Sequence, residues 1–302
     1  MAEGTAVALH RGMRRRERWI AIAAAAGLGA VAQEIVARRY YAATHGPDRF
    51  VEDRESTAWT AAWHEIFLPL EWLGLRASAT YRGDGVPRGD GTPVVLVHGF
   101  LTRGAYLGAL RSWLARLGYD ARVADIGFSA DCLDVLTDRL LVQVRDTRHD
   151  TRRRVHIIGH SLGGMLGRAV AARERDLVAS LAMLGSPFRG LAVHPALRLG
   201  AAVVRAGVHA VRGERVERGC LTLACGCATV RSIRAPLPAD LPQLAVASRH
   251  DGLADWRYCL HPPTAATVTA RSSHMGLVLN AMVYEALARH LALPSARALA
   301  AS

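Results

Sequence analysis

The most constraining feature of the sequence is a glycine-rich segment, Gly159-His160-Ser161-Leu162-Gly163-Gly164, between two apolar stretches. Residues 155–158 predict a buried strand and residues 162–173 predict a helix. A serine on such a tight strand-to-helix turn adopts a strained backbone conformation with its hydroxyl exposed, and the flanking glycines let strand and helix approach closely. The segment therefore predicts a nucleophilic Ser161 at the centre of a strand–turn–helix unit.

The chain from Thr92 onward repeats this unit. Apolar runs predict strands at 94–97, 121–126, 155–158, 178–184, 244–248 and 267–270. Helical periodicity is found at 106–117, 131–144, 162–173 and 276–291. Strands that alternate with helices form parallel βαβ units, so the sequence predicts an α/β fold with a mostly parallel sheet flanked by helices.

One long insertion interrupts this alternation. No strand is predicted between residues 187 and 242, only a helix at 196–211 followed by a segment that contains cysteines. An insertion of this kind is typical of a lid, which we place at about residues 188–241. Its helix has one apolar face, and two roles stay open for that face: covering the substrate pocket or packing on the core. The residues of this face are Leu197, Ala201, Val204 and Val208.

A nucleophilic serine requires a general base, and the base requires an acid that orients it. His274 follows the last predicted strand and Asp251 follows the strand before it. The carboxyl ends of parallel strands lie at one edge of a sheet, so both side chains are expected near Ser161. Asp255 is the alternative acid, and we favour Asp251 because it lies in the loop directly after its strand. The predicted catalytic residues are therefore Ser161, Asp251 and His274.

The first predicted strand ends at His98-Gly99-Phe100. A backbone N–H at this place can point toward the nucleophile, and so can the first amide of the helix after Ser161. We therefore assign the oxyanion hole to the backbone N–H groups of Phe100 and Leu162, which would stabilise the charge that develops on a carbonyl oxygen. His98 itself is expected to form hydrogen bonds within its loop.

Together these motifs resemble the bacterial triacylglycerol lipases and esterases of the α/β-hydrolase superfamily. The resemblance rests on Val97-His98-Gly99-Phe100, the segment 159–164, Leu184-Gly185-Ser186-Pro187, Asp251-Gly252 and Ser273-His274. A group of actinobacterial hydrolases is also similar, in Glu71-Trp72 and in the turn at 83–91. The similarity extends over roughly residues 71–293 and implies a serine hydrolase that cleaves carboxylic esters through an acyl-enzyme on Ser161.

Other functions could be served by a chain with these sequence features. An acyltransferase would use the same triad with an alcohol as acceptor, and a binding protein of this fold would not require the triad. Residues 27–32 match a dinucleotide-binding pattern but lack the strands that such a site needs. No metal ion or organic cofactor is implied, and the expected substrate is a small-molecule or lipid ester.

The charge of the chain does not indicate a nucleic-acid partner. The formal net charge is +12, and all 38 basic residues are arginine. These arginines are scattered and are not interleaved with aromatic residues in a recognisable module, so we expect no nucleic-acid binding.

Composition divides the chain into residues 1–38, a helical lead-in and turn-rich connector at 39–90, and a catalytic domain at 91–295. A basic run at 11–18 precedes an uncharged apolar stretch at 19–32. This pattern predicts either an export or anchoring signal, which would place the protein in the cell envelope in association with its membrane, or a surface helix of a cytoplasmic protein.

The lead-in contains a predicted helix at 59–75. Trp59, Trp63, Ile66, Phe67 and Leu70 recur at helical spacing and line one face. We favour packing of this face on the catalytic core over an interfacial helix at a membrane, because packing requires no further partner.

Three of the five cysteines, Cys220, Cys225 and Cys227, lie in the insertion, at a spacing that does not suit a zinc site. In an exported protein we expect a disulfide that anchors the insertion, with Cys259 as the outside partner. In a cytoplasmic protein we expect free thiols.

Overall fold

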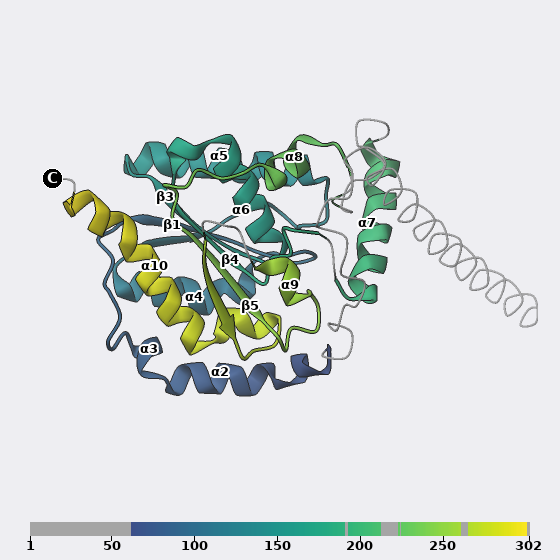
Figure 1. Cartoon of the computed structure of the whole chain (residues 1–302). Helices are drawn as coiled ribbons and strands as arrows, with labels where there is room; N and C mark the ends of the chain where they lie inside the picture. Colours follow the sequence, from purple (N-terminus) through teal and green to yellow (C-terminus); the bar gives the residue numbers. More distant parts are fainter. Residues whose placement is uncertain (1–61, 191–192, 213–222, 224, 261–264, 301–302) are drawn as a thin grey trace, which may run out of the picture.

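The computed structural model describes residues 62–190, 193–212, 223, 225–260 and 265–300. Within them one six-stranded sheet has the order β2-β1-β3-β4-β5-β6, and every pairing is parallel (Figure 1). The strands are β1 (Pro93–Val97), β2 (Asp120–Val123), β3 (Val155–His160), β4 (Val178–Leu184), β5 (Gln243–Ser248) and β6 (Ala266–Ala270).

Helices connect the strands and cover both faces of the sheet (Figure 1). The α-helices are α2 (Leu68–Ala77), α3 (Ala79–Arg82), α4 (Gly108–Leu117), α5 (Leu133–Thr151), α6 (Leu162–Arg173), α7 (Pro195–Arg212), α8 (Ala228–Arg234), α9 (Trp256–Cys259) and α10 (Ala281–Ala300). The 3₁₀ turns are η2 (Ala62–Phe67), η3 (Ala105–Leu107), η4 (Arg175–Leu177) and η6 (Met275–Leu279).

Two hydrophobic cores result, one on each face of the sheet. Successive residues of a strand point to opposite faces. Val95 and Val97 of β1 therefore join the core formed with α5, α6 and α8, whereas Val94 and Leu96 join the core formed with α4 and α10. The predicted α/β fold, a parallel sheet with helices on both faces, is confirmed.

The main difference in element bounds lies after β6. A single helix was predicted at 276–291, whereas the chain forms η6 first and α10 begins at Ala281. The reason is a capping interaction: Asn280 Oδ1 accepts hydrogen bonds from the backbone N–H groups of Met282 (3.0 Å) and Val283 (3.3 Å). A side chain that satisfies the first free amides of a helix sets its start, so the polypeptide turns at Asn280 and leaves His274 in a loop.

The lead-in helix is present as η2 and α2, but its orientation is the reverse of the one we favoured. Trp63, Ile66 and Leu70 are exposed, and the side that faces the protein carries Leu75 and two glutamates. The prediction that the apolar face packs on the core is therefore wrong. The glutamates bind backbone amides near His274, and this interaction turns the apolar face outward.

Several predictions fall on residues outside the described ranges. These are the segment 1–38, the part of the lead-in up to residue 61 with Trp59, and Cys220. In the described parts of the insertion the chain forms α7 and α8, and Val193 forms an isolated bridge with Ala254. The assignment of this insertion as a lid stays a prediction.

Candidate active site

Ser161 lies on the turn between β3 and α6 with a positive φ of 55° and a ψ of −122°. This is an uncommon backbone conformation for a residue with a side chain. The Ser161 N–H donates to the Leu184 carbonyl of β4 at 2.8 Å. A Cβ on Gly159 would overlap the backbone of Gly164, and a Cβ on Gly163 would overlap the Val97 carbonyl. The turn thus has the close strand–helix approach that a nucleophilic serine requires.

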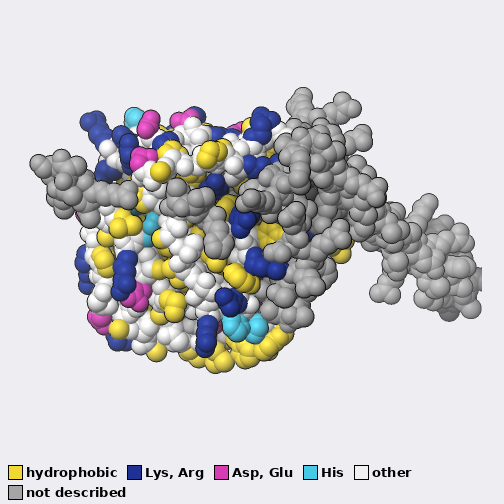
Figure 2. All heavy atoms as spheres, viewed as in Figure 1, with side chains coloured by type: hydrophobic (Ala, Val, Ile, Leu, Met, Phe, Trp, Pro, Cys, Tyr) yellow, Lys and Arg dark blue, Asp and Glu magenta, His cyan; other side chains and the backbone are white. Residues whose placement is uncertain are grey.

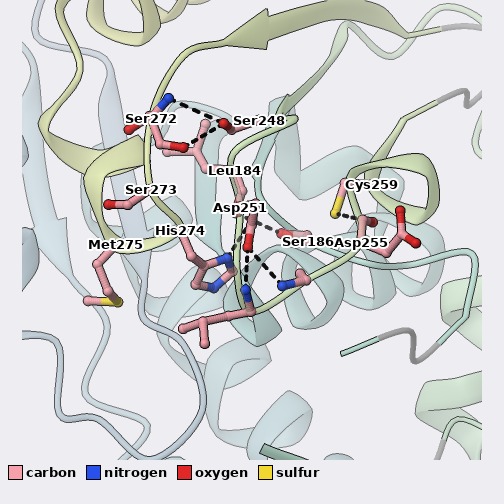
Figure 3. Close-up of polar contacts among 12 residues, drawn as sticks. Leu184, Ser186, Ser248, Asp251, Asp255, Cys259, Ser272, Ser273, His274 and Met275 are labelled. Carbon is pink, nitrogen blue, oxygen red and sulfur yellow. Dashed lines mark hydrogen bonds and ion pairs between the residues drawn. The ribbon is translucent and has the colours of Figure 1, made fainter. Parts of the chain in front are cut away.

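His274 and Asp251 form a buried pair at the same edge of the sheet. His274 Nδ1 lies 2.7 Å from Asp251 Oδ2. Asp251 Oδ1 accepts hydrogen bonds from the N–H groups of Leu253 (2.9 Å) and Ala254 (2.8 Å). Figure 3 shows the Asp251 carboxylate beside the His274 imidazole. A carboxylate held in this way fixes the proton on Nδ1 and leaves Nε2 as the basic nitrogen.

The electrostatic environment of His274 favours its protonated form. Burial alone lowers the pKa of this imidazole, but the charge and hydrogen bond of Asp251, with a smaller contribution from Glu65, outweigh burial and raise the pKa above its ordinary value. A base with a raised pKa accepts a proton more readily from a hydroxyl group.

Asp255, the alternative acid, serves a different interaction. Its carboxylate pairs with Arg257, with Oδ2 and Nη2 2.8 Å apart, and it caps the start of α9. Figure 3 shows Asp255 apart from the imidazole, beside Cys259. The structure therefore places Asp251, and not Asp255, in contact with His274.

Gly185 places the end of β4 against the His274 ring. It has a φ of 57°, and a Cβ there would lie 3.2 Å from both Nδ1 and Cε1 of His274. Because the preceding Leu184 carbonyl accepts the Ser161 N–H, this one segment contacts both the serine turn and the imidazole. The motif Leu184-Gly185-Ser186-Pro187 contributed to the resemblance, but its steric role is visible only in the structure.

A hydrogen-bonded chain through Tyr106 and His160 also joins the loops of the site. The Gly99 N–H donates to Tyr106 Oη (2.8 Å), Tyr106 Oη lies 2.9 Å from His160 Nδ1, and His160 Nε2 lies 3.1 Å from the His274 carbonyl. Burial lowers the pKa of His160 to about 3, with the nearby His274 charge as a second cause. The imidazole is thus neutral, and since a carbonyl only accepts, Nε2 donates to His274 and Nδ1 accepts the Tyr106 proton.

The two residues whose amides are predicted to form the oxyanion hole line the same pocket as Ser161. Phe100, Ser161 and Leu162 all line it. Leu162 is the first residue of α6, where a helix leaves its amides without intrahelical partners. As expected for a residue that organises this loop, His98 Nδ1 lies 3.0 Å from Thr102 Oγ1.

The remainder of the pocket is apolar and includes part of the insertion. From α7, Leu197 and Ala201 line the pocket, whereas Val204 and Val208 pack on the core. The apolar face of this helix therefore contacts both the pocket and the core. The other lining residues are Leu133, Met165, Pro187, Val193 and Leu223.

Comparisons with known proteins find similarity over parts of this chain. A family model described as palmitoyl protein thioesterase matches residues 93–226. A triacylglycerol lipase of Pseudomonas fragi is 31% identical over 168 residues, which are 54% of this chain and 55% of the lipase. A triacylglycerol lipase of Pseudarthrobacter phenanthrenivorans is 36% identical over 107 residues, 32% of this chain and 34% of that protein. The chain thus spans between a third and about half the length of these curated relatives.

Two solved structures are similar to this chain at low sequence identity. Est1E from Butyrivibrio proteoclasticus is 18% identical, with a TM-score of 0.47 over 70% of this chain and 92% of that one. A Bacillus licheniformis lipase is 16% identical, with a TM-score of 0.49 over 70% of this chain and 51% of that one. The family-model match coincides with the strand order and the strained serine described above. The chain thus has an α/β-hydrolase fold, and its residues 93–226 resemble the palmitoyl protein thioesterase family.

The loop of His274 is bound by two carboxylates that the sequence did not single out. Glu65 accepts from the N–H groups of His274 (2.6 Å) and Met275 (3.1 Å). Glu71 accepts from the N–H and the hydroxyl of Ser273, at 2.7 and 2.6 Å, and from the Ser272 hydroxyl at 2.9 Å. The only sequence signal was Glu71-Trp72 in the resemblance to actinobacterial hydrolases, and it did not indicate this role.

The structure records no disulfide among the four described cysteines, and Cys220 lies outside the described residues, so the disulfide expected for an exported protein stays a prediction. Cys225 and Cys227 lie together, with their sulfur atoms 3.1 Å apart. Cys259 instead lies 3.5 Å from the Asp255 carbonyl in α9. A bridge from Cys259 to Cys225 or Cys227 is therefore not formed.

Proposed function

We propose that this α/β-hydrolase is a serine hydrolase that cleaves carboxylic esters through an acyl-enzyme on Ser161. The observation that carries the proposal is the buried His274–Asp251 pair at the sheet edge where Ser161 opens into an apolar pocket. We assign Ser161 as nucleophile, His274 as general base and acid, and Asp251 as the residue that orients the imidazole.

The reaction then follows from these positions. His274 Nε2 accepts the Ser161 hydroxyl proton as Oγ attacks the ester carbonyl carbon. The negative charge that forms on the carbonyl oxygen is stabilised by the N–H groups of Phe100 and Leu162. His274 returns the proton to the leaving alcohol, and the C–O bond to that alcohol breaks. A water molecule, deprotonated by His274, then attacks the acyl carbon; the bond from this carbon to Ser161 Oγ breaks, His274 returns the proton to Oγ, and the acid leaves.

The pocket supports an apolar acyl group as the part of the substrate that is recognised. Its lining beyond Ser161 is hydrophobic, and hydrophobic surfaces bind hydrocarbon by excluding water. Two kinds of relative, triacylglycerol lipases and the palmitoyl protein thioesterase family, are named for the release of fatty acyl groups. We propose fatty acyl esters as the substrate class, and the thioesterase match makes acyl thioesters the second candidate.

We further propose that the insertion at about residues 188–241 acts as a lid of the catalytic domain, which we place at residues 91–295. The support is that Leu197 and Ala201 of α7 form part of the pocket wall. The last residue of α7, Arg212, pairs with Asp131 before α5, with Nη2 and Oδ2 2.7 Å apart. Opening the insertion would break this partly buried pair.

The test is an activity screen of purified protein on p-nitrophenyl esters of increasing chain length and on a palmitoyl thioester. Ser161→Ala should lower kcat by about a thousandfold or more, because the triad residues act as a unit. Ser112→Ala, on the exposed side of α4, is the matched control and should retain wild-type turnover. A fluorophosphonate probe should label the wild type at Ser161. Labelling at another residue, or full turnover by Ser161→Ala, would refute the mechanism.

A further inference from the structure

The outer side of η2 and α2 is an exposed apolar surface next to the active-site edge. Its five side chains, which we call the α2 stripe, recur at helical spacing and so share one face. They are Trp63 (55% exposed), Ile66 (70%), Phe67 (39%), Leu70 (62%) and Leu73 (61%). Figure 2 shows hydrophobic side chains gathered along the lower edge of the view, where Figure 1 places α2. So many large apolar groups together are unusual for a surface in contact with water alone.

The charges of this element are distributed unequally between its two sides. The carboxylates of η2 and α2, Glu65 and Glu71, both bind backbone amides of the His274 loop. The outward side therefore carries no carboxylate of this element, and its last turn carries the exposed Arg76. An apolar face with cationic and no anionic groups is complementary to a membrane surface that carries negative charge.

Further cations precede the two loops that the helix contacts. His64 Nδ1 lies 3.1 Å from the His250 carbonyl, and the exposed Arg249 comes just before it. The exposed Arg271 precedes Ser272, whose hydroxyl binds Glu71. Arginine side chains this close to an anionic bilayer are attracted to its headgroups.

The contacts of the glutamates hold the stripe in a fixed position relative to the catalytic histidine. Glu65 lies between the stripe residues Trp63 and Ile66 in sequence and accepts the His274 N–H on the opposite side of the helix. A surface bound at the stripe would therefore lie beside the loops of His274 and Asp251.

We infer that the α2 stripe docks the protein onto an anionic lipid surface. The stripe would insert at the level of the headgroups with the helix parallel to the membrane, which is the position that tryptophan and branched apolar residues favour on interfacial helices. No helix in the described part of the chain has the length and hydropathy to cross a bilayer. Docking goes beyond the proposed chemistry and does not need turnover; its effect would be to bring membrane-borne acyl groups to the catalytic edge.

The experiment measures binding of the full chain to phosphatidylcholine vesicles with and without phosphatidylglycerol, by flotation. Ile66→Gln/Leu70→Gln keeps the helix propensity and removes two apolar groups from the stripe. Val142→Gln/Leu293→Gln is the matched control, because both of its residues are exposed apolar positions on other helices. We expect binding to require phosphatidylglycerol, the stripe variant to lose at least about tenfold in partitioning, and the control to bind like the wild type.

A second measurement reports on the stripe directly. Brominated phospholipid should quench the tryptophan fluorescence of the wild type, and Trp63→Phe should lose part of this quenching. Partitioning that is equal in the stripe variant and the wild type would overturn the inference, as would a stripe variant that changes only the oligomeric state in size-exclusion chromatography. Ser161→Ala should bind vesicles like the wild type, so a failure of docking and a failure of the proposed chemistry remain distinguishable.

Discussion

The Ser161 turn and the His274 loop lie at the same edge of the sheet, but they are held by different interactions. The serine turn is formed by backbone: its N–H binds the Leu184 carbonyl, and glycines before and after it allow β3 and α6 to touch. The His274 loop depends in addition on side chains that are distant in the sequence. Its amides are bound by Glu65 and Glu71, which precede it by some two hundred residues.

This difference predicts different responses to mutation. A turn made by close backbone contact should fail when a methyl group is added, because the surrounding backbone has no room to move. A loop held by carboxylates should keep most of its shape when one carboxylate is neutralised. The position of the imidazole should then be less well fixed, and the negative charge near it is lost. Variants at the serine turn and at the His274 loop should separate these two responses.

The largest effect should be on the pairing of His274 with its acid. Asp251→Asn removes the carboxylate that fixes the imidazole, so kcat should fall by about a thousand- to ten-thousandfold. Asp255→Asn breaks only the contacts with Arg257 and with the start of α9, and it should change kcat by less than about tenfold. Steady-state kinetics on a short ester measures both. Equal losses would show that the two loops around His274 act as one structural unit.

The serine turn should be the most sensitive to added volume. Gly163→Ala would force its methyl group against the Val97 carbonyl, so we expect a loss of about 2–4 kcal/mol in the free energy of unfolding together with loss of activity. Gly108→Ala is the control, because a Cβ there meets no atom within 4 Å. In the first turn of α4 it should leave stability unchanged or raise it slightly. Thermal unfolding of both variants is the measurement, and wild-type stability of Gly163→Ala would contradict the steric argument.

Neutralising Glu71 should have a moderate effect on the His274 loop. Glu71→Gln retains the size of the side chain but replaces the charged acceptor of these hydrogen bonds with a neutral amide. We expect this change to cost about 1–3 kcal/mol in the free energy of unfolding. We expect kcat to fall by about tenfold with KM nearly unchanged, because the pocket residues are not touched. Glu285→Gln, which breaks an exposed pair with Arg289 on α10, should change neither value. A rise in KM alone would assign Glu71 to substrate binding.

The smallest effect should be a shift in pH dependence caused by Glu65. His274 acts as base when deprotonated, so kcat/KM should fall as the pH drops through its pKa. The Glu65 charge contributes to the raised pKa of His274, and Glu65→Gln should therefore lower that pKa and move the acid limb to lower pH. His160, with its pKa lowered to about 3, stays neutral across this range and adds no limb. An acid limb that does not move, or that moves upward, would show that Glu65 acts on the loop only through its hydrogen bonds.

Much of the fold was readable from short stretches of sequence. The predicted bounds of β4 and α6 coincide with those observed, because an apolar strand or an amphipathic helix records its own burial pattern. The serine turn could also be predicted from a short stretch of sequence, since the glycines that it needs are next to or near Ser161. Ser161 could therefore be predicted from its glycine-rich turn. Asp251 and His274 could be predicted because each follows a predicted strand.

The tertiary structure decided whatever depends on contacts between distant segments. Helical periodicity gave α2 an apolar face but did not determine which side faces the protein, and the amides of the His274 loop turned that face outward by binding Glu65 and Glu71. The chain from Gly99 through Tyr106 and His160 to His274 has no sequence pattern, since its members come from separate segments: the loop after β1, η3, the end of β3 and the loop after β6. Local patterns record whether a side chain is buried, whereas the partner that it meets depends on how the sheet brings separate loops together.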